Sequence, residues 1–369
     1  MIKEIIMLNK IKPIAIYLPQ FHPTPENDEW WGKGFTEWTN VAKATPRFEG
    51  HHQPQLPSDL GFYDLRLEEA RMAQEAMAKE YGIHGFCYYH YWFNGKRLLH
   101  EPLDRKLQNP KEDFPFMLCW ANETWSRRWL GEEKEILIEQ TYSFEDDLQH
   151  INYLIPIFKD KRYIKIYNRP VFVFYRPTFM PDIEKTLKIF RNECKKNGLE
   201  NPYLIASNSH SGHTDLKALG FDDILNFQPK LSSLNNAFVD DNSISKLKSN
   251  LLLGVFSSKL KLFDYQNAKK LMRSKYSYNY LPCSFVGWDN TARRGENGII
   301  IKNQKVEVFI QDLQDEINQL LSQNRNEEEN IFFINAWNEW AEGNHLEPDT
   351  KNSKKYLIAL KELIEKYVR

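Results

Sequence analysis

Apolar runs bounded by turn residues recur along the whole chain, and most are followed by a segment whose apolar positions have helical spacing. Runs without polar alternation are typical of parallel strands that are covered on both faces. Eight such runs predict strands, and these lie at Pro13–Phe21, Gly85–Phe93, Pro115–Asn122, Arg169–Arg176, Tyr203–Ser209, Asp222–Gln228, Leu281–Trp288 and Ile331–Trp337.

Helices are predicted between most of these strands, from apolar stripes that repeat every three to four residues. They cover Leu65–Tyr81, Leu98–Leu107, Phe144–Phe158, Pro181–Asn197, Tyr265–Ser274, Val306–Gln323 and Lys354–Tyr367. The fifth connection, near Asp215–Leu219, is short and only weakly helical.

Eight alternating units predict an α/β fold, a single (β/α)8 TIM-type barrel over residues 1–369. An open doubly wound sheet fits the alternation too, but no glycine-rich phosphate motif follows the first strand. Long connections follow strands 1 and 6, at Thr24–Gly61 and Pro229–Asp264. In a barrel both lie at the C-terminal face, where functional sites are built.

Charge and cysteine usage exclude several classes of protein. The chain has 49 Lys+Arg against 50 Asp+Glu, so it lacks the basic footprint of a nucleic-acid-binding protein. No apolar run reaches the roughly 20 residues of a membrane span, and the N-terminus lacks a signal-peptide core, so we predict a cytoplasmic protein. The four cysteines form no C-x-x-C pair, and we expect neither a metal site nor a cofactor.

Aromatic residues are abundant, with 10 Trp, 18 Tyr and 23 Phe. Most of the Phe are expected in the core, whereas Trp and Tyr beside polar groups are typical of proteins that hold sugar rings.

Polar and aromatic residues gather where the predicted strands end, and in a barrel those ends share one face. We therefore expect a substrate site there, although strand alternation turns some of these side chains into the barrel wall. The candidate substrate-binding residues are Tyr17, Gln20, His22, Trp31, Lys33, Glu37, Trp38, His90, Trp92, Trp120, Asn122, Glu123, Trp288, Asp289, Trp337, Asn338 and Trp340. Trp31, Lys33, Gly34, Glu37 and Trp38 belong to the first long connection and are expected at the rim of the mouth.

The eighth strand carries two glutamates three residues apart, Glu339 and Glu342. In an extended strand they would point to opposite faces about 10 Å apart, so they converge only if the chain turns after Trp340. Two neighbouring carboxyl groups, one protonated and one ionised, are the equipment of glycosidic-bond cleavage. The alternative for either glutamate is a salt bridge at the barrel mouth.

Three segments carry a family resemblance. They are I-Y-L-P-Q-F-H at 16–22, W-W-G-K-G-F-T-E-W at 30–38 and N-A-W-N-E-W-A-E-G at 335–343. Together they resemble the WbsX family, described as glycosyltransferases of cell-surface polysaccharide clusters. That family is similar to glycoside hydrolase family 99, retaining endo-α-1,2-mannosidases built on a (β/α)8 barrel.

In family 99 an E-W-x-E-G segment supplies both catalytic carboxyls, and it matches residues 339–343. The resemblance implies that Glu339 is a base acting on the sugar's own 2-hydroxyl and that Glu342 is the general acid/base. We accordingly expect a raised pKa at Glu342 and an ionised Glu339. Beyond Gly343 the sequence departs from the mannosidase pattern at Asn344-His345, so sugar specificity does not carry over.

These observations predict an enzyme that cleaves or transfers a glycosidic bond of an oligosaccharide or polysaccharide, in cell-surface polysaccharide (O-antigen or capsule) metabolism. One alternative is a sugar-nucleotide-dependent glycosyltransferase, although the D-x-D spacing common in one large class of them is absent. A second alternative is a catalytically idle, glycan-binding barrel.

Overall fold

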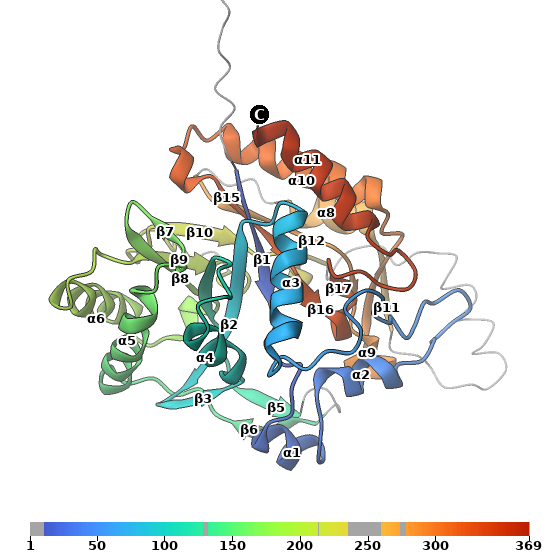
Figure 1. Ribbon diagram of the computed structural model, residues 1–369, viewed down its shortest axis with the longest axis horizontal. Helices are drawn as coiled ribbons and strands as arrows, with labels where there is room; N and C mark the ends of the chain where they lie inside the picture. Colours follow the sequence, from blue (N-terminus) through green and yellow to red (C-terminus); the bar gives the residue numbers. More distant parts are fainter. Residues whose placement is uncertain (1–10, 128–131, 213, 235–259, 274–277, 369) are drawn as a thin grey trace, which may run out of the picture.

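The computed structural model describes residues 11–127, 132–212, 214–234, 260–273 and 278–368. Within them the eight predicted strands form a closed parallel barrel (Figure 1). Its strands are β1 (Lys12–Tyr17), β2 (Gly85–Phe93), β4 (Phe116–Trp120), β8 (Arg169–Phe174), β9 (Tyr203–Ser207), β10 (Asp223–Asn226), β12 (Leu281–Phe285) and β15 (Ile331–Asn335). The predicted (β/α)8 fold is confirmed, with strands that end two to four residues earlier than predicted except at β2.

The first strand closes the barrel by pairing on both sides. Ile14 of β1 lies opposite Gly85 of β2 and opposite Phe333 of β15, both in parallel register. Gly85 is required by a close approach, because a Cβ there would lie 2.7 Å from the carbonyl oxygen of Pro115. The β1 apolar run is buried almost throughout, as a strand covered on both faces must be.

Helices cover the outside of the barrel and follow the predicted segments. They are α3 (Glu68–Glu80), α4 (Glu101–Gln108), α5 (Phe144–Phe158), α6 (Ile183–Lys196), α8 (Tyr265–Met272), α10 (Val306–Leu321) and α11 (Lys355–Val368). Ser143 and Asp182 cap α5 and α6 by accepting a hydrogen bond from a backbone N–H of the first turn. The fifth connection contains turns rather than a helix among its described residues.

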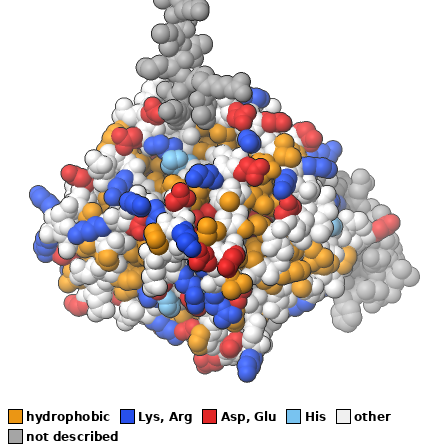
Figure 2. Space-filling view, in the orientation of Figure 1, with side chains coloured by type: hydrophobic (Ala, Val, Ile, Leu, Met, Phe, Trp, Pro, Cys, Tyr) orange, Lys and Arg blue, Asp and Glu red, His pale blue; other side chains and the backbone are white. Residues whose placement is uncertain are grey.

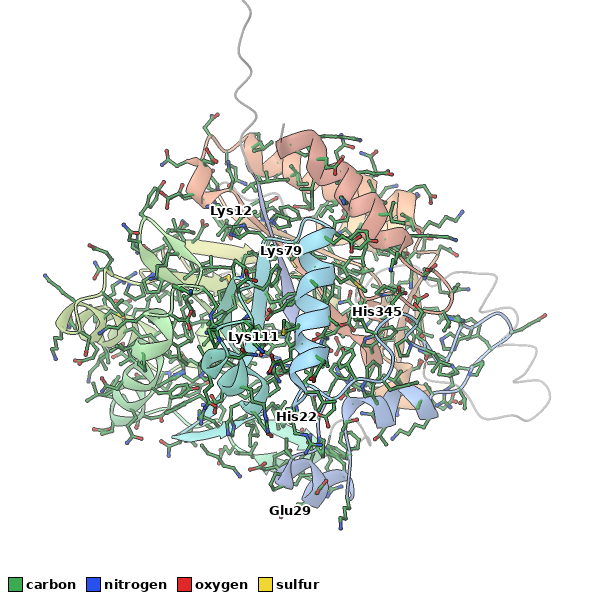
Figure 3. All side chains as sticks on the ribbon, in the orientation of Figure 1. Lys12, His22, Glu29, Lys79, Lys111 and His345 are labelled. Carbon is green, nitrogen blue, oxygen red and sulfur yellow. The ribbon has the colours of Figure 1, made fainter. Side chains whose placement is uncertain are left out.

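The C-terminal ends of the strands face the lower edge of the view. Figure 3 places Lys12 at the start of β1 and His22 beyond its end, so β1 runs downward in that view. The elements gathered at this edge come from the connections that leave the strands (Figure 1). They include α1 (Pro25–Trp31), α2 (Glu37–Lys43), β5 (Trp125–Arg127), β6 (Glu132–Ile138) and α9 (Thr291–Arg294).

Short strands outside the barrel complete the fold. β13 (Trp288–Asp289), β14 (Ile299–Lys302) and β11 (Lys261–Asp264) form a small sheet, and β16 (Asn338–Glu339) pairs with β17 (Asn344–His345). β3 (Lys96–Leu98) pairs antiparallel with the end of β2, and β7 (Lys165–Ile166) pairs antiparallel with the start of β8. Residues 235–259 of the second long connection lie outside the described residues.

The surface shows interspersed charges on the face drawn in Figure 2, where Lys and Arg alternate with Asp and Glu. In the described part of the chain, helices are too short or too polar to cross a membrane.

Candidate active site

The two glutamates of the eighth unit are brought together by a turn. After β16 the chain forms a 3-10 turn over Trp340–Glu342, and Gly343 follows with φ +58°. A Cβ at Gly343 would also lie 3.0 Å from the Cβ of Asp289 and 2.8 Å from Nε2 of Gln55, so both the backbone conformation and the limited space favour glycine here. Glu339 and Glu342 line the same cavity at the C-terminal mouth, which confirms the predicted convergence.

Arg293 of α9 holds both carboxylates. Its Nη1 donates to Oε1 of Glu342 at 2.6 Å, and its Nη2 donates to Oε2 of Glu339 at 3.1 Å. Its Nε donates to Oε1 of Glu37 at 2.8 Å. Three carboxylates therefore surround one guanidinium, and all four side chains are buried or nearly so.

This surplus of carboxylates favours protonation. Burial and repulsion from Glu342 raise the pKa of Glu339 to about 8, despite Arg293. Burial also raises the pKa of Glu342, with Arg293 opposing the rise. The two carboxyls consequently share a proton at neutral pH.

The raised pKa of Glu342 confirms the expectation from the sequence, whereas the raised pKa of Glu339 contradicts the expectation that Glu339 is ionised. The Glu339 side chain is 7% exposed and that of Glu342 is 21% exposed, so Glu339 is desolvated more completely. The closer contact of Arg293 also favours the ionised form of Glu342.

The cavity has a volume of about 430 Å³, within the usual range for small-molecule sites. It is rich in aromatic faces, which suits the C–H faces of sugar rings. The aromatic side chains in its wall are Trp31, Tyr89, Tyr91, Trp125, Tyr175, Phe227 and Trp288.

Polar atoms without protein partners also line the cavity. Within the described residues, Nε2 of Gln20, Nε1 of Trp288 and Oδ1 of Asn335 are buried and make no hydrogen bond. A buried polar atom without a hydrogen-bond partner lowers the stability of the fold, so these atoms mark positions where a ligand hydroxyl or a water molecule can bind.

The structure brings six of the predicted site residues into the cavity wall. They are Gln20, Trp31, Glu123, Trp288, Glu339 and Glu342. Glu123 is bound there by Arg176, which also lines the cavity.

The residues predicted on β2 lie on the face of the strand that points away from the cavity. Tyr89 and Tyr91 line the cavity, whereas His90 and Trp92 face the helix layer, where His90 contacts His150 and Trp92 donates to Asp146 of α5. Successive side chains of a strand point to opposite faces, so choosing His90 and Trp92 selected the outer face.

Other predicted residues hold the barrel wall together instead of lining the cavity. Tyr17 donates to Gln74 of α3, and Trp120 donates to the carbonyl oxygen of Trp92. The Asn122 and Asn338 side chains each bridge two strand ends, Asn122 through the backbone of Arg176 and Asn338 through that of Leu18.

Trp337, Trp340 and His22 are fully buried outside the cavity wall. Trp337 packs against Phe86, and Trp340 stacks on His345 and donates to Glu347.

The first long connection is packed over the mouth, but only part of it reaches the cavity. Trp31 lies in the cavity wall, and Trp38 packs against Trp340. Glu37 lies outside the wall and forms an ion pair with Arg293. Lys33 and Gly34 are exposed and lie outside the cavity wall, as Gly34 donates to Asp28 in a solvent-facing turn. Asp289 faces a second cavity, because it follows Trp288 on β13.

Arg293 is a further residue of the site that the sequence analysis did not predict. It lies five residues after the end of the seventh predicted strand, in Thr291-Ala292-Arg293-Arg294. The available signal was charge balance, since buried glutamates at one mouth require a cation from another strand end.

Comparison with known proteins agrees with this architecture. A family model described as glycosyltransferase WbsX matches residues 13–360. An uncharacterized protein, WxcX, of Xanthomonas campestris pv. campestris (strain B100) is 38% identical over 353 residues, which are 95% of this chain. The match covers 49% of that relative, so the chain spans about half its length.

Solved structures show the same fold. A glycoside hydrolase family 99 endo-α-mannosidase from Bacteroides thetaiotaomicron superimposes with a TM-score of 0.57 at 13% identity, covering 96% of this chain and 97% of that one. A glycoside hydrolase-like protein gives a TM-score of 0.58 at 12% identity, covering 96% and 94%. At these low identities the solved structures show only that the fold is shared, whereas the family model shows a relationship in sequence. The chain belongs to the WbsX glycosyltransferase family, a family of carbohydrate-active enzymes.

Proposed function

We propose that the protein cleaves or transfers a glycosidic bond of an oligosaccharide or polysaccharide through Glu339 and Glu342. The observation that carries the proposal is the pair itself, one buried and one partly buried carboxyl on one arginine in an aromatic-lined cavity. Glycosidic cleavage needs one carboxyl with its proton and one without, and the raised pKa values supply that state near neutral pH.

The roles of the two carboxyls follow the family 99 pattern in this proposal. Glu339 acts as the base on the sugar 2-hydroxyl, and Glu342 protonates the leaving oxygen and later activates the incoming hydroxyl. The shared proton must therefore reside on Glu342 when substrate is bound. Without substrate the shorter Arg293 contact favours the ionised form of Glu342, so in this proposal substrate binding moves the proton from Glu339 to Glu342.

Glu37 contributes a third negative charge behind Arg293. Its Oε2 is buried and unpaired among the described residues, and its charge is among the causes that raise the pKa of both other glutamates. We infer that Glu37 keeps Arg293 in place and limits how far it stabilises the ionised pair.

The substrate is a glycan chain in this proposal. Trp31 and Trp125 flank the cavity and offer stacking faces, and the unpaired Gln20, Trp288 and Asn335 atoms meet hydroxyl groups. The setting of cell-surface polysaccharide metabolism is part of the proposal and is supported by the WbsX family match.

A second candidate, transfer from a sugar nucleotide, is favoured by the family's description as glycosyltransferases. A third candidate is glycan binding without catalysis. One assay separates the three: release or transfer of sugar from a panel of cell-envelope polysaccharides, with and without sugar nucleotides.

Wild type is compared there with Glu339→Gln, Glu342→Gln and the exposed control Glu184→Gln. The proposal expects activity without a sugar nucleotide and at least about 100-fold loss in both active-site variants. A strict requirement for a sugar nucleotide supports the second candidate, and retained activity in both variants overturns the proposal.

A further inference from the structure

A second cavity of about 300 Å³ lies beside the catalytic cavity. It is built from three distant parts of the chain, the first long connection near Phe48–Gln55, β14 with its following turn, and the segment before α11. Its lining includes Phe48, Gln55, Asp289, Gln304, Lys351 and Tyr356.

The two cavities lie back to back. Trp288 and Asp289 are neighbours on β13, and because side chains alternate on a strand, Trp288 lines the catalytic cavity and Asp289 the second one.

Two glycines complete the thin partition. The Gln304 amide lies against Gly287, where a Cβ would be 2.9 Å from its Nε2, and the Gln55 amide lies against Gly343 in the same way at 2.8 Å.

The chemistry of the lining suits a polyhydroxylated ligand. Lys302 and Lys351 are balanced by Asp289 and Asp349, so the lining carries no surplus of either charge. Phe48 and Tyr356 supply aromatic surface, and amide side chains supply paired donors and acceptors.

Several polar groups there are available. In the described part of the chain, the Gln304 amide and the Tyr356 hydroxyl have no hydrogen-bond partner, and Nε2 of His52 is buried and unpaired. The two aspartates, by contrast, are already bound. Asp289 accepts from His51 and Gln53, and Asp349 accepts from backbone N–H groups of the next turn.

We propose that this second cavity is a saccharide-binding site that holds a sugar unit behind the catalytic turn. The inference rests on the proposed function for the class of ligand, while the geometry of the site is independent of it.

A ligand in this site has a direct connection to the catalytic pair. Oδ1 of Asp289 accepts hydrogen bonds from the backbone N–H and the hydroxyl of Thr291, the first residue of α9. The same helix carries Arg293, which binds Glu339 and Glu342. A bound sugar that moves Asp289 therefore also moves Thr291, the first residue of the helix that carries Arg293.

The test is ligand-observed NMR titration of the full chain carrying Glu342→Gln. The probes are the methyl glycosides of glucose, galactose and mannose, glucuronate, and inorganic phosphate. Gln304→Ala and Tyr356→Phe are expected to weaken binding of at least one sugar about tenfold, the effect of one good hydrogen bond. Trp125→Ala weakens binding in the catalytic cavity, so the effects of Gln304→Ala and Tyr356→Phe are also measured in that background, where they are expected to persist.

Matched controls outside the cavity are Gln311→Ala on α10, the helix that begins two residues after Gln304, and Tyr367→Phe on α11, the helix that carries Tyr356. Lys351→Ala is a further variant at an exposed position, which removes a cavity donor without disturbing the core. If Gln304→Ala, Tyr356→Phe and Lys351→Ala all bind each sugar as tightly as the parent chain does, the inference is overturned. It is also overturned if the parent chain binds phosphate but none of the sugars.

The result is separable from the proposed function. If Glu342→Gln retains activity but the second cavity binds sugar, the catalytic proposal fails and this inference stands. If Glu342→Gln is inactive and the cavity variants bind sugar as tightly as their parent does, the catalytic proposal stands and this inference fails.

Discussion

Replacing Glu339 by Gln should abolish activity and stabilise the protein at alkaline pH. The pKa of Glu339 is raised from 4.5 to about 8 by burial and by Glu342, so its ionised form is unfavourable in the folded state. A group with a raised folded-state pKa contributes stability that is complete below pH 4.5 and is lost as pH rises toward 8. The neutral amide of Gln has nearly the same shape and does not ionise.

The size of the effect follows from the same pKa values. At about 1.4 kcal/mol for each tenfold change, a rise from 4.5 to about 8 corresponds to an upper bound of roughly 5 kcal/mol. The two carboxyls share a proton, and the amide of the variant would lose a charged contact with Arg293, so we expect about 2–4 kcal/mol.

The assay is urea unfolding of wild type and Glu339→Gln at pH 5 and pH 9, with Glu184→Gln as the control. We expect the variant's stability relative to wild type to increase by that amount between the two pH values. An unchanged difference would refute the reasoning, because Glu339 would then ionise in the folded protein as readily as in the unfolded chain.

Other parts of the site have equally specific consequences. Arg293→Met leaves buried carboxylates without their cation, and it should lower the free energy of unfolding by about 3–5 kcal/mol at pH 8 in urea titrations; a loss below about 1 kcal/mol would contradict the ion-pair geometry. Trp125→Ala should weaken glycan binding by about 0.5–1.5 kcal/mol and leave the turnover of saturated enzyme unchanged, and an effect on turnover alone would argue against a stacking role. Trp340→Phe leaves Glu347 short of a buried donor and should cost about 1–3 kcal/mol, measured by thermal unfolding, whereas an unaltered melting temperature would show that Glu347 does not need that bond.

The barrel was predictable because its strands are buried on both faces. A run such as Gly85–Phe93 lacks polar alternation, and its bounds in the structure match the prediction. The other strands were predicted too long at the C-terminal end, because the polar residues that follow them at the mouth no longer pair with a neighbouring strand. Residues 207–210 illustrate this, since β9 ends at Ser207 and the chain turns there.

The mouth was harder to predict, for two physical reasons. Which side of a strand faces the cavity depends on its register, and in β2 the prediction chose His90 and Trp92 over Tyr89 and Tyr91. Contacts between distant connections were the second reason, since nothing near Glu339 in sequence indicates Arg293.

Some local signals at the mouth were present but unused. The segment Thr24-Pro25-Glu26 has an N-cap residue, a proline at the first helical position and an acidic first turn, and it begins α1. The turn between Glu339 and Glu342 was predicted correctly, because two carboxyls can act together only if the chain bends between them.

The most direct test of the account is the action of Glu342→Gln on two substrates of the same glycan, one with its natural sugar leaving group and one with an activated aryl leaving group. If Glu342 protonates the leaving oxygen, the variant should lose at least about 100-fold more activity on the natural linkage than on the aryl glycoside, because an activated aglycone needs little protonation. Equal losses on both substrates would contradict the assignment and show that Glu342 is not the acid of the pair.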